Sequence, residues 1–530
     1  MLGLRARNCT TGDILDDEQI QAARKEDVLN ALSKMASNFR ARVGESLATL
    51  RQHDTPLAEA TTPSLEALKA YSASLRVGYS RGCAASVPFG RRAIEIDPKF
   101  AMAHSHLGRC YSNLGESVLA AESTTRAYEL RGRVSDREKF YIALNYDRQV
   151  IGNLGKAQQI GKLWAQTYPR DAVAHGSLSG LIYQSSGKYE ESIEEARKTI
   201  ALDPDVAPAY VNLGFSYCYV GRLGEAGNVI QRASERNLET PDLLLLRYYI
   251  AFLKSDKAGM EEAAARARGR PGAEDYMSHS QALVLARSGQ LKLAGKVSRR
   301  AADLAQQEGE RERAATYETG VAVWEAFFGN ASEARRSAMQ ALEVSKGRDV
   351  EYGAAFALAL AGDLSRSRAL ADDLARRFPE DTSVKFSYLP VLRGLSALNH
   401  SEPSKAIAQL QAAANNELAV PGVGLFAFFG SLYPAYVRGE AYLALHQGAA
   451  AATEFQKLLD RRGIVLADPV GAIARLKLGR AFALSGDRNK ARTAYRDFFT
   501  LWEDADADIP ILRQAKAEYA KLQPPTAPEI

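Results

Sequence analysis

Between residues 173 and 238 one pattern of apolar, small and polar positions occurs twice, at a fixed offset. Gly180 and Gly214 lie 34 residues apart, and so do Tyr183 and Tyr217. Within each copy apolar residues recur every three or four positions, which is typical of amphipathic helices. Self-similarity at this period indicates an array of helix–turn–helix units. We therefore expect repeated helix pairs here.

Glycine and proline positions set the limits of each expected unit. A glycine inside a helix costs roughly 1 kcal/mol relative to alanine, so a recurring one such as Gly214 indicates that the second helix lies close against the first. Gly221 is expected to end the first helix, because glycine tolerates the left-handed backbone. Pro204 cannot continue the preceding helix and marks the boundary between units.

This stretch resembles tetratricopeptide (TPR) repeats. The residues that carry the resemblance are Leu213, Gly214 and Tyr217, the turn glycine Gly221, the small residues Ala226 and Ala233, and the stop at Asp203 and Pro204. The resemblance implies an all-α fold, a right-handed TPR-type α-solenoid of about ten to twelve helix pairs. Such a protein is expected to bind a protein or peptide partner.

The rest of the chain is expected to flank and extend this array. The first residues alternate around a Thr-Gly-Asp turn, which predicts a short β-hairpin. The hairpin either docks on the helices or is the remnant of an upstream domain. The expected segments are a hairpin at 1–17, a long amphipathic helix at 18–52, a linker at 53–63, the N-terminal array at 64–240, divergent repeats at 241–420, a C-terminal pair at 421–502, and a capping helix and tail at 503–530.

Two stretches near the C-terminus carry specific expectations. Residues 420–437 form the most apolar run, but glycines, a serine and a proline interrupt it. It therefore lacks the ~20 unbroken apolar residues of a membrane span, and we expect a buried repeat helix with its turn. Residues 463–469 are expected to form an extended joint before the last repeat.

Length, charge and cysteine content exclude several classes of fold and of binding site for this chain. At 530 residues the chain exceeds what one compact core supports, and the repeats favour a solenoid with a continuous core. The net charge of +5, from 68 basic and 63 acidic residues, is small. No nucleic-acid reading module accompanies the basic clusters, so no nucleic-acid partner is expected. The four cysteines have no paired spacing, which argues against a disulfide framework or a zinc site.

The sequence contains no motif that predicts catalysis. Kinase signatures and a Walker loop are absent. We therefore expect no enzyme activity, no cofactor and no metal, and the remaining candidate site is the concave groove of the solenoid.

The TPR resemblance places groove positions on the first helix of each repeat. They are Met102, Ser105, Arg109 and Asn113; Ile142, Tyr146 and Gln149; Ser177, Leu181 and Gln184; and Val211, Phe215 and Tyr219. This set departs from the lysines and asparagines with which the family clamps chaperone tails. Its apolar and aromatic centre has two interpretations: an anchor strip for a partner segment, or side chains packed on neighbouring helices or covered by a distant part of the superhelix.

A second resemblance covers nearly the whole chain. The stretches at 5–32, 62–72 and 498–522 resemble the C-terminal TPR regions of bacterial multidomain serine/threonine kinases and winged-helix regulators. Two hypotheses follow. The chain is a non-catalytic interaction scaffold, or it is the sensory region of a larger signal-transduction protein whose catalytic or DNA-binding domain lies upstream. A cytoplasmic location is expected, or an extracytoplasmic one if a membrane helix precedes the repeats.

Overall fold

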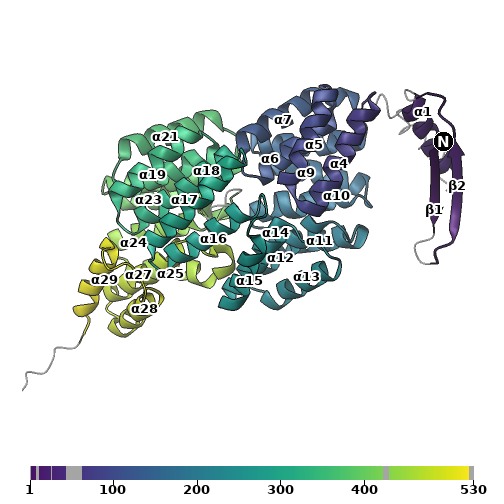
Figure 1. Cartoon of the computed structure of the whole chain (residues 1–530). Coiled ribbons are helices and arrows are strands. Elements are labelled where there is room, and N and C mark those ends of the chain that lie inside the picture. The colour runs from purple at the N-terminus through teal and green to yellow at the C-terminus, as the bar shows by residue number, and fades with distance from the viewer. Residues whose placement is uncertain (1, 8–10, 25–26, 43–61, 422–428, 524–530) are drawn as a thin grey trace, which may run out of the picture.

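The computed structural model describes residues 2–7, 11–24, 27–42, 62–421 and 429–523. It begins with an antiparallel pair of strands, β1 (Leu2–Arg7) and β2 (Ile14–Ile20), in which Leu2 faces Ile20. One helix, α1 (Val28–Arg42), packs on this pair. Figure 1 shows these three elements beside the large helical body.

The hairpin is confirmed, but it extends further than the sequence predicted. Residues 18–20, expected to open the long helix, belong to β2, and α1 begins only at Val28. The strand persists because its polar side chains find partners on α1: Arg42 forms ion pairs with Asp16 at 2.9 Å and Glu18 at 2.6 Å. The expected helix residues 43–52 and the linker up to residue 61 lie outside the described residues.

From residue 65 the chain is a series of consecutive helix pairs. The first six are α4 (Leu65–Arg81) with α5 (Cys83–Ile96), α6 (Ala101–Asn113) with α7 (Ser117–Glu129), α8 (Asp136–Tyr146) with α9 (Leu154–Thr167), α10 (Ala172–Gly176) with α11 (Tyr189–Leu202), α12 (Ala207–Tyr219) with α13 (Leu223–Glu235), and α14 (Pro241–Leu253) with α15 (Lys257–Ala267). Helices α8 and α10 continue into the π-helices Asp147–Ile151 and Ser177–Tyr183.

Six further pairs and a final helix follow. They are α16 (Glu274–Arg287) with α17 (Leu291–Gln307), α18 (Arg311–Phe327) with α19 (Ala331–Val344), α20 (Arg348–Leu360) with α21 (Leu364–Arg377), α22 (Leu389–Asn399) with α23 (Pro403–Leu410), α24 (Tyr433–Ala444) with α25 (Gly448–Asp460), α27 (Val470–Leu484) with α28 (Arg488–Leu501), and then α29 (Pro510–Ala520). The all-α fold of paired, TPR-like helices is confirmed.

The two helices of a pair are buried to different extents. Helix α18 is buried along nearly its whole length, whereas α19 buries only a stripe of small residues: Ala334, Ser337, Ala338 and Ala341. First helices are enclosed by neighbours on several sides, and second helices expose one face. This difference explains why first helices such as α12 are apolar almost all round, and second helices such as α13 are amphipathic.

The glycines that suggested repeats have two separate roles. Gly221 has φ +80° at the end of α12, as expected for a turn glycine. Gly214 differs from expectation: a Cβ there would lie 2.3 Å from Cδ2 of Leu246, on α14. Its missing side chain therefore lets the first helix of the next pair approach, and not the second helix of its own pair.

The solenoid winds into a superhelix whose late pairs pack on its early ones. In these contacts, the turn that follows the first helix of one pair meets a segment near the start of a first helix far along the chain. The Arg313 backbone N–H donates to the Glu116 carboxylate at 3.1 Å, and the Thr382 N–H donates to the Gly152 carbonyl at 2.9 Å. Asp506 N–H donates to the Gly289 carbonyl at 3.0 Å. The second pair thus meets the eighth, and the third meets the tenth.

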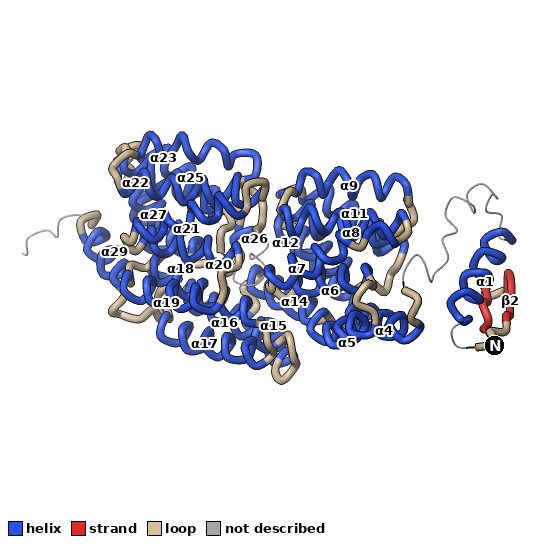
Figure 2. Tube along the Cα trace, turned by 90° about the horizontal axis from the view of Figure 1, so that it is seen from above, coloured by secondary structure: helices blue, strands red, loops and turns tan. Residues whose placement is uncertain are grey.

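One expectation near the C-terminus is revised by this packing. The expected extended joint at 463–469 contains a short helix, α26 (Arg462–Val465), which lies beside α12 (Figure 2). A Cβ at Gly463 would lie 1.8 Å from the Cys218 carbonyl oxygen, so only glycine permits this contact. Of the apolar run 420–437, residues 422–428 lie outside the described residues, and α24 begins at Tyr433. Within the described ranges no helix is both long and apolar enough to cross a membrane.

Candidate functional site

The inner face of the superhelix encloses a cavity of about 760 Å³. One wall consists of the first helices α4, α6, α8, α10 and α12, with the π-helices that extend α8 and α10. The opposite wall comes from the late pairs: the start of α18, the start of α20 and the loop at Asp381. The concave groove expected from the sequence is therefore a chamber, closed on one side by residues far along the chain.

The structure brings nine of the thirteen expected groove residues to this chamber. They are Met102, Arg109, Asn113, Gln149, Ser177, Leu181, Gln184, Val211 and Phe215. The other four, Ser105, Ile142, Tyr146 and Tyr219, do not line it.

Those four residues pack against neighbouring helices. Ile142 and Ser105 are fully buried. Tyr146 stacks on Tyr128, with ring centroids 3.8 Å apart. Tyr219 is 3% exposed and lies 4.9 Å from the ring of Tyr189. The continuous aromatic strip suggested by the sequence is thus divided between the chamber and the core.

Sequence reasoning missed part of the chamber for two physical reasons. Arg148 falls outside the helical spacing that relates Ile142, Tyr146 and Gln149. The π-helix Asp147–Ile151 widens the turn, so that Arg148, Gln149 and Val150 all line the cavity. The wall from α18, α20 and Asp381 has no local signal, because it depends on how far the superhelix turns.

Most charged groups of the chamber are paired within the protein. Arg348 forms ion pairs with Asp349 at 3.0 Å and Asp381 at 2.7 Å. Arg313 pairs with Asp275 at 3.0 Å and with Glu310. These ion pairs fix the ends of α18 and α20 where they face the first turn of the superhelix.

Glu312 joins the two turns of the superhelix. Its carboxylate accepts hydrogen bonds from the Ser117 hydroxyl and from the Val118 backbone N–H at 3.1 Å. Burial raises the pKa of Glu312 to about 7, although the hydrogen bonds from Ser117 and Val118 lower it. Near neutral pH this carboxyl is thus partly protonated.

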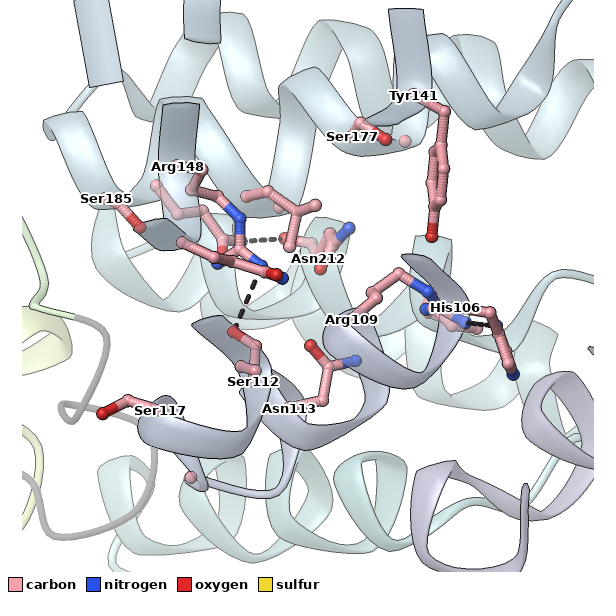
Figure 3. A pocket seen from close by; sticks show the side chains of 18 of the residues that line it. His106, Arg109, Ser112, Asn113, Ser117, Tyr141, Arg148, Ser177, Ser185 and Asn212 are labelled. Atoms are coloured by element: carbon pink, nitrogen blue, oxygen red, sulfur yellow. Dashed lines mark hydrogen bonds between the residues drawn. The ribbon is translucent and has the colours of Figure 1, made fainter. Parts of the chain in front are cut away.

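Arg109 and Arg148 differ from the other arginines of the chamber. Neither forms an ion pair with a carboxylate in the described part of the chain. Arg109 donates a long hydrogen bond to Nδ1 of His106 (3.5 Å) and lies 6.0 Å above the Tyr79 ring. Arg148 donates from Nη2 to the Ser112 hydroxyl at 3.1 Å, and its buried Nε has no partner among the described residues. Figure 3 shows both side chains at the cavity.

Burial acts strongly on Arg148. It lowers the pKa of this guanidinium to about 10, and the cations Arg348 and Arg109 act in the same direction. Three guanidinium groups therefore lie close enough to repel one another, while only Arg348 has acidic partners.

Neutral polar groups complete the lining. Gln184 donates from Nε2 to the Asn212 carbonyl at 2.7 Å and to the Ser216 hydroxyl at 2.9 Å. Gly180 lies under Asn212: a Cβ there would come within 2.5 Å of that amide. The glycine repeated at offset 34 thus makes room for a polar side chain of the chamber. No cluster of three or more potential metal ligands occurs among the described residues.

Comparison with protein families finds a match for one segment of the array. Residues 178–206 match the tetratricopeptide repeat family model. The matched stretch runs from the π-helix Ser177–Tyr183 through α11, within the pair where the sequence pattern is clearest. A search of curated proteins found no match.

Two solved structures align with most of this chain. The crystal structure of yeast Tom70 aligns with 86% of this chain and 95% of its own, at 14% sequence identity and a TM-score of 0.31. The P58(IPK) TPR domain aligns with 86% of this chain and 98% of its own, at 12% identity and a TM-score of 0.21. The comparisons give no support to the resemblance to bacterial multidomain kinases and winged-helix regulators.

Proposed function

We propose that this chain is a non-catalytic interaction scaffold that holds a segment of a protein partner at its concave chamber. Tetratricopeptide repeats are generally protein–protein interaction modules, and the inner surface of a solenoid is its usual binding surface. The observation that carries the proposal is the cavity of about 760 Å³ lined by the first helices. Its lining includes the half-buried Leu181 and Val211 and the exposed Val118, which is 43% exposed.

A displayed library of random peptides, selected on the purified full chain, tests this proposal. The selected peptides are expected to lose about tenfold in affinity, roughly 1.4 kcal/mol, when Leu181 and Val211 are both changed to alanine. The melting temperature should change little, because both side chains are only half-buried. Phe89→Ala, on the outer face, is the matched control and should bind as the wild type does.

Selected peptides that bind the Leu181→Ala, Val211→Ala variant as tightly as the wild type would contradict the proposal. So would a library from which no peptide is enriched.

A second candidate function is a sensory or regulatory region of a larger signalling protein. It is favoured by one observation: the chamber wall combines α6 and α8 with α18 and α20, which lie about 200 residues apart in the sequence. An occupant that contacts both turns binds best to one arrangement of them, and it therefore shifts the population of arrangements. The intact mass of the endogenous protein tests this candidate. A mass larger than this chain by a domain supports it, and a mass equal to this chain contradicts it.

We further propose a cytoplasmic location. The described cysteines Cys83, Cys110 and Cys218 are free thiols, a state typical of reducing compartments. Immunolocalisation or fractionation of the endogenous protein is the direct measurement, and recovery outside the cytoplasm would contradict this proposal.

A further inference from the structure

The two arginines without acidic partners lie in the same chamber and come from adjacent helix pairs. Arg109 is on α6, and Arg148 is on the π-helix that extends α8. Neither is on the outer surface, where water would solvate the charge fully, and both are half-buried. Removing a charge from water is costly unless an opposite charge or a set of hydrogen bonds replaces the solvent. Among the described residues, one neutral acceptor faces each guanidinium: His106 for Arg109 and Ser112 for Arg148.

No carboxylate of the chamber forms an ion pair with Arg109 or Arg148 in the described part of the chain. Asp349 and Asp381 are engaged by Arg348. Glu312 is held by Ser117 and Val118, and burial keeps it partly protonated by raising its pKa to about 7. Glu122, Glu138, Asp203 and Asp242 also line the chamber, but none of them forms an ion pair with Arg109 or Arg148 among the described residues.

We propose that the chamber binds a small organic anion, an acid with a flat apolar body, whose carboxylate, sulfonate or phosphate group lies between Arg109 and Arg148. Guanidinium groups present several N–H donors in a plane and match such oxyanions in a bidentate manner. Ser112 and Asn113 lie beside them and offer further hydrogen bonds (Figure 3).

The remaining walls fit the apolar body of such a ligand. Tyr71, Tyr141 and Phe215 line the cavity, together with Leu181 and Val211. The volume of about 760 Å³ lies within the range of roughly 300–1,000 Å³ that is typical of small-molecule sites. This inference goes beyond the proposed scaffold function, because it requires no protein partner.

Fluorescence titration of the purified full chain tests the proposal, with anilinonaphthalene sulfonate as the probe. Its neutral counterpart, phenylnaphthylamine, has the same aromatic body without the anionic group. We expect the sulfonate to bind saturably at one site per chain. Changing both Arg109 and Arg148 to glutamine should weaken it by about tenfold or more and leave the affinity for phenylnaphthylamine unchanged. Arg496→Gln, at an exposed arginine of α28, is the matched control and should bind as the wild type does.

A second measurement uses the unmodified protein. It therefore tests the proposal even if the double variant does not fold. Benzoate should displace the bound sulfonate, and benzyl alcohol of similar size should not. Equal displacement by the two compounds, or equal sulfonate affinity in the wild type and the double glutamine variant, would overturn the proposal. Both results are independent of peptide selection, so this inference and the scaffold function can fail separately.

Discussion

At the scale of single residues, periodicity predicted which positions face inward but not what they meet there. Phe215 and Tyr219 are four residues apart on one face of α12, and their rings stack at 6.0 Å. Phe215 reaches the chamber, whereas Tyr219 packs on Tyr189. A residue that faces inward in a solenoid can therefore be part of the core, because the inner helices have neighbours on several sides.

Tyr219→Ala is accordingly expected to destabilise the fold. Its side chain is 3% exposed, and truncating a buried aromatic residue typically costs about 3–5 kcal/mol. Thermal or urea unfolding measures the change. Phe89→Ala is the control: this ring is 43% exposed, and its removal should cost well under half as much. Equal losses in the two variants would show that Tyr219 is not a core residue.

At the scale of elements, the local sequence encodes where the helices of a pair begin and end. It does not encode local departures from ideal helical geometry. Gly187 and Gly221 end first helices with φ of +69° and +80°, as a turn glycine should. The π-helix Asp147–Ile151 has no such signal, yet it decides that Arg148 faces the chamber. A local widening of one turn redirects a side chain that an ideal helix would place elsewhere.

Gly214→Ala tests how adjacent pairs pack. The added Cβ would lie 2.3 Å from Cδ2 of Leu246, which is fully buried and has no room to move. We expect a net loss of about 1–3 kcal/mol, despite the roughly 1 kcal/mol that alanine contributes to helix stability. Gly224→Ala is the matched control, because nothing lies within 4 Å of its Cβ position in α13. Chemical denaturation of the two variants should give changes of opposite sign, and a stabilised Gly214→Ala variant would contradict the packing.

At the scale of the whole molecule, the contact between early and late pairs converts a groove into a chamber. Glu312 is central to it, because its carboxyl group on α18 caps the start of α7 through Ser117 and Val118. Gly347 accommodates the same carboxyl group, since a Cβ there would overlap it. This contact carries a titratable group and is therefore sensitive to pH.

The pH dependence of this contact has a defined sign. Burial raises the pKa of Glu312 from 4.5 to about 7 in the folded protein. The stabilisation that the protonated Glu312 carboxyl contributes to the folded protein is therefore fully present below pH 4.5 and is lost as the pH rises through 7. By linkage the loss amounts to roughly 3 kcal/mol. We expect the free energy of unfolding of Glu312→Gln to fall less than that of the wild type across this range. Glu225→Gln, at an exposed position, should follow the wild type, and parallel curves for all three proteins would refute the assignment.

The sequence by itself determined the paired helices, the turn positions and the N-terminal hairpin, because these depend on local periodicity and on glycine conformations. It also placed nine of thirteen expected groove residues at the cavity, since a helix face follows from spacing alone. Only the tertiary structure decided that α18 and α20 close the groove, that Tyr219 belongs to the core and that Tyr146 stacks on Tyr128. Small angles between successive pairs accumulate along a solenoid, so the position of its second turn depends on every interface before it. No short stretch of sequence encodes that sum.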